Sequence, residues 1–594
     1  MNSEKYKNTD YEVRDIRDLR ELINSCAELY GESPAFLVKD EPGGEYRPIS
    51  HREWNIDVNA LGTCFVSRGL RGKKIAVIGE NSYEWVVTYF ATVNGCGVIV
   101  PIDRELEEAE MQNLLERAEV SAVIHSGKLA EKVNKIIPRL RNIEFVADIS
   151  LGPGEQPEGI AEGDDVPRYP WYDLLEEGKQ LVRDGNRDFI EADIDREAMC
   201  TLLFTSGTTG MAKGVMLSHR NLASNVVATS HYVKIIDTKV GLSVLPMHHT
   251  YEMSCHVMTG LYQGIAVAIC EGLKYITKNM QEAQATVMLS VPLIFEAIHK
   301  RIFRQAQNSG KLEKLRRGIA LSKKYKLYNK PWITKRMFKD VHKTFGNHMT
   351  LFIAGGAAID PKVIEDFEAM GIPMIQGYGM TESSPIIALN RDRCSKAAAG
   401  GFPLPGTEVK IVDPDEDGNG EIWCRSESVM IGYYENEEAT REVLDEDGWL
   451  DTGDIGYIDD EGYVYITGRQ KSVIITKNGK NVFPEEIEYY LGLSDFIQEA
   501  LVHAVPDRRG DSVVKAEILP NFDNIVEETG RHLDEDELIA FIKNEVERVN
   551  SLMPLYKRVR RFSIRHSDFD KTTTRKIKRY NEENLTSEGK ETSC

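Results

Sequence analysis

The sequence has no run of eighteen or more apolar residues and no pair of cysteines at the spacing Cys-x-x-Cys. The first absence argues against a transmembrane helix. The second argues against a zinc or disulfide framework, and nine scattered cysteines are typical of reduced thiols in a cytosolic enzyme. The first twenty residues are crowded with charged side chains, unlike a secretory signal peptide. We therefore expect a cytoplasmic protein.

Length and charge narrow the class of protein further. A chain of 594 residues is too long for one hydrophobic core, which predicts about two to four domains. Its apolar content of 41% and charged content of 28% are ordinary for a globular protein. The net charge of −21 argues against general binding of nucleic acid by the protein surface, because the phosphates of nucleic acid are also negative.

Residues 300–343 depart from this acidic average. They contain fifteen lysines and arginines and two acidic residues, so the segment carries +13 and the remainder −34. Apolar residues are interleaved with the basic ones, which leaves two interpretations open. The segment forms helices that pack on the protein through an apolar stripe, or it forms a basic amphipathic surface for peripheral contact with an anionic membrane.

Alternating strand and helix patterns predict an α/β fold with a largely parallel sheet covered by helices. Residues 74–79, 98–101 and 120–124 are short apolar strands, and residues 83–92 form an intervening helix. Residues 198–204 are another apolar strand. These patterns together predict parallel-sheet α/β subdomains in the first part of the chain.

The later part of the chain has a different pattern. Residues 401–462 contain short strand patterns separated by Gly, Asp and Asn turns, which predicts a β-rich subdomain. A small α+β unit is expected after residue 471. We expect domain limits at 1–470 and 471–580, followed by a polar, disordered tail at 581–594.

The most informative stretch is Phe204–Gly214. Small hydroxyl residues alternate with glycines, and Lys213 follows them. Glycines let backbone N–H groups approach a phosphate chain closely, and the lysine supplies a point charge for it. This is not the Walker A pattern, which has four residues between its glycines and a hydroxyl residue after its lysine. The stretch predicts a phosphate-binding loop of another kind.

Further motifs follow in a fixed order along the chain. Each is a short segment that contains a carboxylate, a histidine or a basic residue, and three of the five also contain glycine. The motifs are Leu245–Glu252 (LPMHHTYE), Gln376–Glu382 (QGYGMTE), Trp449–Asp454 (WLDTGD), Gly468–Lys471 (GRQK) and Thr574–Arg579 (TRKIKR).

These motifs resemble those of the adenylate-forming, AMP-binding superfamily, and the histidine segment and the basic insertion resemble its long-chain fatty acid–CoA ligase branch. The resemblance covers residues from about Ser33 to Arg579. Ala212 stands where the family usually has proline, and Arg575 where it usually has glycine. The resemblance implies a large N-terminal AMP-binding domain and a small, mobile α+β C-terminal catalytic domain.

The implied chemistry explains the residue types. A carboxylate becomes reactive toward a thiol once it is joined to AMP as a mixed anhydride. Forming that acyl-adenylate brings two anions together, so fixed positive charge matters more than a base. The implied reaction converts fatty acid, ATP and CoA into acyl-CoA, AMP and pyrophosphate, with Mg²⁺ as cofactor.

The resemblance also assigns roles to residues. Lys576 and His249 are the expected catalytic residues, Lys471 is the hinge, and Thr205 and Glu382 are the metal ligands. Lys571 and Lys578 are the alternatives to Lys576. The expected ATP-binding residues are Thr205, Ser206, Gly207, Thr208, Thr209, Gly210, Lys213, Gly356, Ala357, Ala358, Gly377, Tyr378, Gly379, Met380, Thr381, Asp454 and Arg469.

Three alternatives to this function remain. An acyl carrier protein could replace CoA as the thiol acceptor, and the basic segment could attract that acidic protein as readily as a membrane. A non-catalytic nucleotide-binding protein on the same fold is disfavoured, because Lys576, Glu382 and Asp454 are all present. A kinase or phosphohydrolase is disfavoured because the Walker arrangement is missing.

Overall fold

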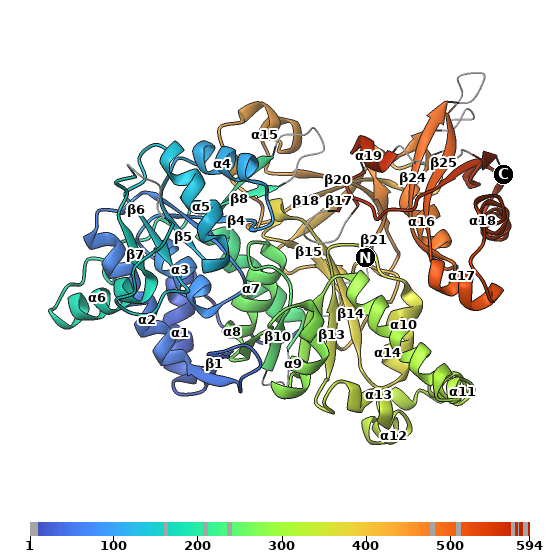
Figure 1. The fold of residues 1–594 in the computed structure, drawn as a ribbon, viewed down its shortest axis with the longest axis horizontal. Helices are drawn as coiled ribbons and strands as arrows, with labels where there is room; N and C mark the ends of the chain where they lie inside the picture. Colours follow the sequence, from blue (N-terminus) through green and yellow to red (C-terminus); the bar gives the residue numbers. More distant parts are fainter. Residues whose placement is uncertain are drawn as a thin grey trace. The chain divides into compact units, whose positions relative to one another are not determined.

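The computed structural model describes residues 10–159, 164–205, 212–234, 240–475, 481–506, 512–571, 577–579, 581–585 and 592–593. The chain forms two compact units (Figure 1). The first comprises Met1–Glu408, Cys424–Leu450 and Asp460–Tyr463. The second comprises Val409–Trp423, Asp451–Asp459 and Val464–Cys594. The expected domain limits at residues 470 and 580 stay predictions.

The first unit contains an eight-stranded sheet whose strands β3 to β8 run parallel wherever they pair. β8 ends at Thr205 and pairs with the antiparallel strand β9, which begins at Lys213. In order the strands are β19 (Gly432–Tyr433), β9 (Lys213–Ser218), β8 (Met199–Thr205), β4 (Val98–Ile102), β3 (Lys74–Ile78), β5 (Val120–His125), β6 (Phe145–Asp148) and β7 (Arg168–Pro170). Helix α2 (His51–Ser67) precedes β3, and the helices that lie between these strands in the chain include α3 (Tyr83–Val93), α4 (Glu108–Arg117), α5 (Ala130–Ile136) and α6 (Trp171–Arg183).

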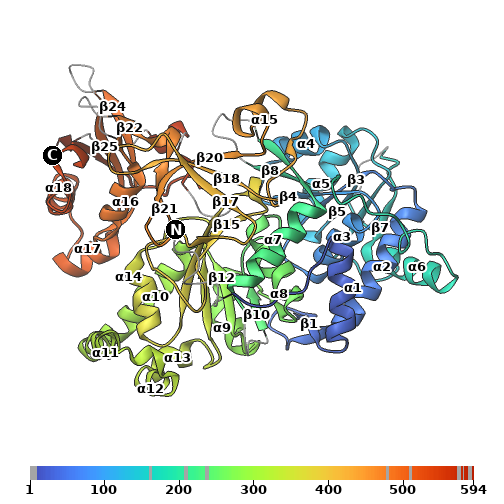
Figure 2. The ribbon, with the colours of Figure 1, turned by 180° about the vertical axis from the view of Figure 1, so that it is seen from behind.

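The first unit also contains a nine-stranded sheet, visible from both sides in Figures 1 and 2. Its central strands are parallel, so their carboxyl ends share one edge. In order the strands are β16 (Phe402–Pro403), β15 (Ile386–Leu389), β14 (Met374–Gly379), β13 (Leu351–Ala354), β12 (Val287–Ser290), β10 (Val240–Ser243), β11 (Ala266–Ile269), β1 (Pro34–Val38) and β2 (Arg47–Ser50). Its helices include α1 (Leu19–Tyr30), α7 (His219–Tyr232), the π-helix η5 (Tyr251–Met258), α8 (Thr259–Tyr262), α9 (Ile276–Glu282) and α14 (Pro361–Ala369). The predicted α/β fold is confirmed.

The basic segment 300–343 is helical. It covers the end of α10 (Pro292–Asn308), then α11 (Leu312–Tyr325), α12 (Pro331–Met337) and most of α13 (Lys339–Thr344). Its buried apolar residues join the core around β12 and β13, and they are Ile302, Ile319, Phe338 and Val341. These helices therefore pack on the rest of the protein through apolar side chains, which agrees with the interpretation of residues 300–343 as packed helices.

A buried carboxylate also holds this helical segment in place. Asp366 of α14 accepts hydrogen bonds from His299 Nε2 of α10 at 3.1 Å and from Lys323 Nζ of α11 at 2.9 Å. Lys362 Nζ donates to it from within α14 at 2.8 Å. Burial alone would raise the pKa of the Asp366 carboxyl, but the hydrogen bonds from His299, Lys362 and Lys323 lower it well below its usual value. One side chain thus joins three helices.

We expect Asp366→Asn to lower the free energy of unfolding by about 1 to 3 kcal/mol, because it removes the buried charge that accepts hydrogen bonds from Lys323 and Lys362, which are themselves partly exposed to water. The carboxylate stabilises the fold above its unfolded pKa of about 3.9, and that contribution is lost as pH falls through the lower folded value. Urea titrations of wild type and variant at pH 7 and pH 3 measure this, and the difference should shrink at pH 3. Glu365→Gln is the matched control, since that exposed residue also binds Lys323, at 3.0 Å. An equal loss in both variants would contradict the role of Asp366.

The second unit is an α+β structure. It contains most of one four-stranded sheet, a two-stranded ribbon and a second four-stranded sheet packed against helices. The strands are β17 (Glu408–Val412), β18 (Gly420–Arg425), β20 (Leu450–Ile458) and β21 (Val464–Arg469), then β22 (Ile474–Ile475) and β23 (Asn481–Val482), then β24 (Ile497–Pro506), β25 (Ser512–Pro520), β26 (Arg561–Ile564) and β27 (Thr592–Ser593). The helices are α16 (Pro484–Gly492), α17 (Phe522–Thr529), α18 (Glu535–Asn550) and α19 (Glu582–Leu585).

The expectation of a disordered tail is wrong for residues 581–585. The side chain of Asn584 is fully buried. Its Oδ1 accepts from Asp570 N, and its Nδ2 donates to Asp570 O and Lys578 O, at 2.8 to 2.9 Å. A polar side chain that forms three hydrogen bonds can stay buried, so the polar composition of residues 581–585 was not enough to predict disorder there.

No helix in the described ranges is long and apolar enough to cross a bilayer. The eight cysteines in those ranges are all free thiols, as expected.

Candidate active site

Several predicted residues of the first unit follow parallel strands of the nine-stranded sheet at its carboxyl edge. His249 lies in the segment after β10, Gly356–Ala358 follow β13, and Met380–Glu382 follow β14. Since β10, β12, β13 and β14 are neighbours in this order, their carboxyl ends gather these segments along one edge. In open α/β sheets such an edge is where ligands bind.

Glu382 and Lys213 are joined through a residue that the motifs did not indicate. Tyr433 Oη donates a hydrogen bond to Glu382 Oε1 at 2.9 Å, and Lys213 Nζ lies 4.6 Å from the centre of the Tyr433 ring. Tyr433 is opposite Val215 of β9 in the antiparallel pair β9–β19. Burial and the neighbouring Glu382 carboxylate raise the pKa of Tyr433, so it remains a hydrogen-bond donor at neutral pH.

The residues around Glu382 fit a magnesium ion bound largely by phosphate and water. Glu382 is only 9% exposed, and one carboxylate oxygen is held by Tyr433. Thr205 pairs with Lys213 at the start of the phosphate loop and supplies a hydroxyl oxygen. No group of three or more His, Cys, Asp or Glu that could cage a metal occurs in the described ranges. One or two protein oxygens suit Mg²⁺, which keeps water and substrate ligands.

The histidine segment is fixed by Asn81 and Glu252. Asn81 Nδ2 donates to Leu245 O at 2.6 Å, and Asn81 Oδ1 accepts from Met247 N at 3.0 Å. The fully buried Glu252 accepts from Leu245 N at 3.3 Å and from His256 Nδ1 at 2.7 Å. These bonds lock the backbone just before His249. Glu252 and His256 lie on η5, and π-helices are frequent at functional sites.

Tyr251 connects the histidine segment to the predicted adenine loop. Its Oη donates to Ile353 O at the end of β13 at 3.1 Å. A Cβ atom at Gly355 would lie 2.7 Å from Tyr251 Cζ, so only glycine fits there. Gly356, Ala357 and Ala358 follow and are exposed, so the structure brings the His249 segment against the loop that carries them.

His248 differs from its neighbour His249. Its side chain is 10% exposed, and its Nε2 lies 3.6 Å from Asp103 Oδ2. Burial lowers the pKa of His248 to about 3, so the imidazole is neutral at physiological pH. The contact of His249 with substrate stays a prediction.

Gly377, Tyr378 and Gly379 form the end of β14 and pair with β15. Only glycine fits at position 379, because a Cβ atom there would lie 1.9 Å from the backbone oxygen of Pro385. Tyr378 is mostly buried, and Met380 and Thr381 lead directly into Glu382. The backbone of Gly379 therefore packs closely against Pro385, beside the strand β15 with which β14 pairs.

In the second unit the structure brings Asp454 and Arg469 together. They are opposite each other on β20 and β21, and Arg469 Nε lies 2.7 Å from Asp454 Oδ1. Asp454 is 4% exposed. Lys471 is exposed in the short helix η9 (Gln470–Ser472) that follows β21. The arginine orients the carboxylate of Asp454.

We expect Asp454→Asn to raise the KM for ATP about tenfold to a hundredfold, because hydrogen bonds to a charged group contribute about 1.5 to 3 kcal/mol. Pyrophosphate release at varied ATP concentration measures this. Asp451→Asn is a matched control from the same strand. An unchanged KM in Asp454→Asn would contradict the ribose assignment.

Other predicted residues lie outside the described ranges. These are Lys576 and, in the phosphate loop, Ser206, Gly207, Thr208, Thr209 and Gly210. Their roles stay predictions, together with the hinge at Lys471.

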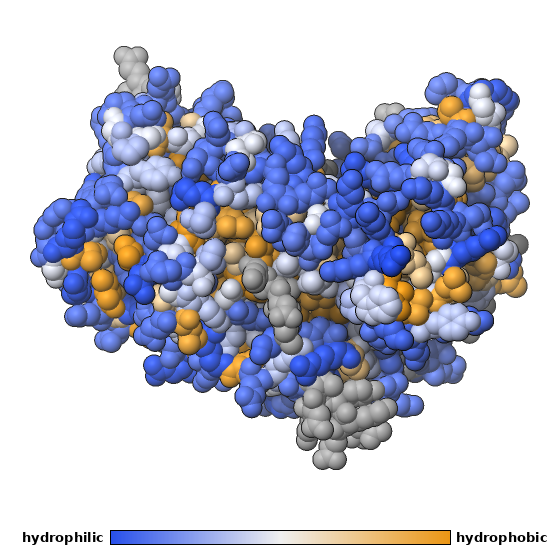
Figure 3. All heavy atoms as spheres, turned by 90° about the horizontal axis from the view of Figure 1, so that it is seen from below, coloured by the Kyte–Doolittle hydropathy of each residue, from blue (hydrophilic) through white to orange (hydrophobic). Residues whose placement is uncertain are grey.

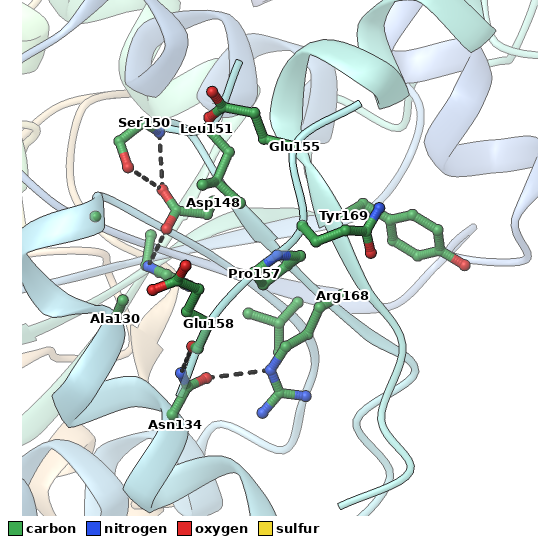
Figure 4. A pocket seen from close by; sticks show the side chains of 14 residues that line it. Ala130, Asn134, Asp148, Ser150, Leu151, Glu155, Pro157, Glu158, Arg168 and Tyr169 are labelled. Carbon is green, nitrogen blue, oxygen red and sulfur yellow. Dashed lines mark hydrogen bonds and ion pairs between the residues drawn. The ribbon is translucent and has the colours of Figure 1, made fainter. Parts of the chain in front are cut away.

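A separate cavity of about 670 Å³ lies beside β5, β6 and β7 in the first unit (Figure 4). It contains none of the predicted site residues. The guanidinium of Arg168 in its wall is already paired with Asp164 at 2.5 Å, and Asp148 accepts hydrogen bonds from Ser150. Its walls also carry Glu155 and Glu158, so the cavity suits a triphosphate poorly.

Comparison with known proteins agrees with this geometry. The family model of AMP-binding enzymes matches residues 24–434. Relatives include the chloroplastic long-chain-fatty-acid–[acyl-carrier-protein] ligase AEE15 of Arabidopsis thaliana, 27% identical over 84% of this chain and 76% of its own length. The peroxisomal long chain acyl-CoA synthetase 6 of the same plant is 28% identical over 84% and 71%. ATP-bound MatB from Rhodopseudomonas palustris is a similar solved structure, with a TM-score of 0.70, 25% identity and coverage of 94% and 97%.

Proposed function

The chain belongs to the AMP-binding enzyme family, and from this membership we propose that it is a long-chain fatty acid–CoA ligase. In the proposed reaction the carboxylate of a fatty acid attacks the α-phosphorus of ATP and displaces pyrophosphate, which forms an acyl-adenylate. The thiol of CoA then attacks the acyl carbon, loses its proton and displaces AMP to give acyl-CoA. The observation that carries the proposal is the buried Glu382 carboxylate joined through Tyr433 to Lys213.

The side chains divide the work as follows. Lys213 and the phosphate loop hold the β- and γ-phosphates of ATP, and Asp454 with Arg469 holds the ribose. His249 donates a hydrogen bond to the reacting carboxylate or the α-phosphate, and Lys576 places its charge near the bridging oxygen. The reaction needs no general base, because the attacking carboxylate is already ionised.

Glu382 and the Thr205 hydroxyl would hold Mg²⁺. The ion, when bound, neutralises charge on the phosphates. Adenylate-forming enzymes use ATP, and the similar structure of o-succinylbenzoate CoA synthetase from Bacillus subtilis contains ATP and a magnesium ion.

The alternative acceptor is an acyl carrier protein. It is favoured by one observation, the similarity to the plant acyl-carrier-protein ligase named above. The adenylation step is the same for both acceptors, so the residues assigned above serve either.

A panel of fatty acids from acetate to oleate, supplied with ATP and Mg²⁺ with and without CoA, tests the proposal. The expected result is CoA-dependent release of AMP that peaks on long chains. Adenylate that CoA fails to discharge would favour the carrier protein. No pyrophosphate with any acid would overturn the proposal.

The proposal places the enzyme in the cytoplasm, with access to acids that partition into membranes. Peripheral contact with a membrane through residues 300–343 is part of it.

A further inference from the structure

Arg117, the last residue of α4, contacts both sides of the hairpin β8–β9. Its Nη1 donates a hydrogen bond to Ala212 O at 3.0 Å, and its Cζ lies 5.4 Å from the centre of the Phe204 ring. Phe204 immediately precedes Thr205, and Ala212 immediately precedes Lys213. One side chain therefore reaches the neighbours of the two residues that begin and end the predicted phosphate loop.

The carbonyl groups of three consecutive residues at the start of β9 accept hydrogen bonds. Arg117 donates to the first of them, and the second, that of Lys213, accepts from Thr205 Oγ1 at 3.4 Å. The third, that of Gly214, accepts from Tyr434 N at 2.7 Å. The bonds from Arg117 and Thr205 are partly buried, in contrast to the surface seen from below in Figure 3, where hydrophobic and hydrophilic atoms mingle. The backbone on both sides of Lys213 is thus held, and Arg117 joins it to a helix.

The hairpin β8–β9 extends beyond the strands that pair with it. β4 pairs with β8 at Thr201, four residues before Thr205. β19 pairs with β9 from Val215 onward, two residues beyond Lys213. A hairpin of two strands is only marginally stable by itself, so its end needs contacts with other elements. Arg117 supplies such a contact at the end where Thr205 and Lys213 pair.

We infer that Arg117 is a positioning residue for the site that binds the phosphates of ATP. By holding the residues before Thr205 and Lys213, it keeps these two in place before ATP arrives, so that binding ATP costs less ordering of the chain. A guanidinium suits this role, because it can donate to a carbonyl group while it also lies against an aromatic ring. The inference rests on the proposed function for the identity of the ligand.

Binding of ATP with Mg²⁺, measured by equilibrium dialysis without any fatty acid, tests the inference. Arg117→Met keeps a long side chain beside Phe204 and loses the hydrogen bond to Ala212 O. Its Kd for ATP should rise about tenfold, the lower end of what a hydrogen bond from a charged group contributes. Arg117→Lys keeps a charged donor and should recover to within about threefold of the wild type. Unchanged Kd in Arg117→Met would overturn the inference.

Salt distinguishes positioning from a direct attraction between the guanidinium and the phosphates. Between about 0.1 M and 1 M salt the Debye length falls from about 10 to 3 Å, which removes the effect of a distant charge. A hydrogen bond to a neutral carbonyl group persists, so the Kd ratio of Arg117→Met to wild type should stay within about twofold of its low-salt value. A ratio that falls to one at high salt would contradict the positioning role.

Lys132→Met is the matched control. Lys132 of α5 donates from Nζ to Leu106 O at 2.7 Å, so this variant loses the same kind of bond and the same charge, next to the start of α4. It should bind ATP as the wild type does, and urea should unfold it at about the concentration that unfolds Arg117→Met. Equal weakening of ATP binding in both variants would show a general loss of stability and overturn the inference.

The same measurements separate this inference from the proposed function. A wild type that binds ATP but releases no pyrophosphate with any acid would count against the proposed function alone, and the Kd values would still decide the role of Arg117. A wild type that does not bind ATP would overturn both.

Discussion

Replacing Glu382 by glutamine is expected to lower the rate of acyl-adenylate formation about 100- to 1,000-fold. Glutamine has nearly the same size and still accepts the hydrogen bond from Tyr433 Oη, so the local packing survives. What disappears is the negative charge that would hold Mg²⁺ beside the phosphates of ATP. Pyrophosphate release measured over a range of Mg²⁺ concentrations should show a higher requirement for the metal in the variant.

Tyr433→Phe is the matched control for this prediction. It keeps the ring that lies beside Lys213 and removes only the hydroxyl that orients Glu382. A smaller loss, about tenfold, is expected, since one hydrogen bond to a charged group is removed and the charge remains. Glu382→Gln with an unchanged Mg²⁺ dependence would show that Glu382 stabilises the fold and does not bind the metal.

The fold was predictable where the sequence has strong local patterns. Residues 74–79, 98–101 and 198–204 became β3, β4 and β8, and residues 83–92 became α3 with one more residue at its end. Strands that are buried on both faces need continuous runs of β-branched and apolar residues. Such runs can be recognised in the sequence without knowing which strands pair with them.

The interior of the site was less predictable because its contacts span long separations. Tyr433 and Glu382 are 51 residues apart, and Asn81 lies 164 residues from the Leu245 carbonyl it binds. The spacing of residues within a short motif gives no information on pairs that are so far apart in the sequence. The π-helix η5 was also missed, because its sequence YEMSCHVM has no distinct period and its identity depends on the bonds of Glu252 and Tyr251 to other elements.

The burial of Asn584 in residues 581–585 was also not predictable from local sequence. Residues 581–585 are polar and would be expected to stay in water. Asn584 instead binds the backbone on both sides of the segment that contains Lys576, at Asp570 and Lys578. Only the complete set of hydrogen bonds makes its burial favourable.

Lys576→Ala should suppress acyl-adenylate formation about 100- to 1,000-fold and leave the transfer of a supplied acyl-adenylate to CoA within a few-fold of wild type. We propose that Lys576 places its charge beside the bridging oxygen in the first half-reaction, and that the hinge proposed at Lys471 would let the C-terminal domain adopt a different conformation for thioester formation. Pyrophosphate exchange measures the first step, and thioester formation from synthetic acyl-adenylate measures the second. The two rates must therefore separate in this variant.

The neighbouring lysines Lys571 and Lys578 provide the controls. Lys571 Nζ is bound to Glu499 at 2.6 Å, and Lys578 Nζ lies 3.1 Å from Asp570 Oδ2. Cations already paired within their own unit have less charge to offer a phosphate, so Lys571→Ala and Lys578→Ala should change both half-reactions equally and by less than about tenfold. If Lys578→Ala showed the selective loss instead, the catalytic lysine would be two residues later than assigned. Equal loss of both half-reactions in Lys576→Ala would mean that this side chain supports the domain and does not act in adenylation.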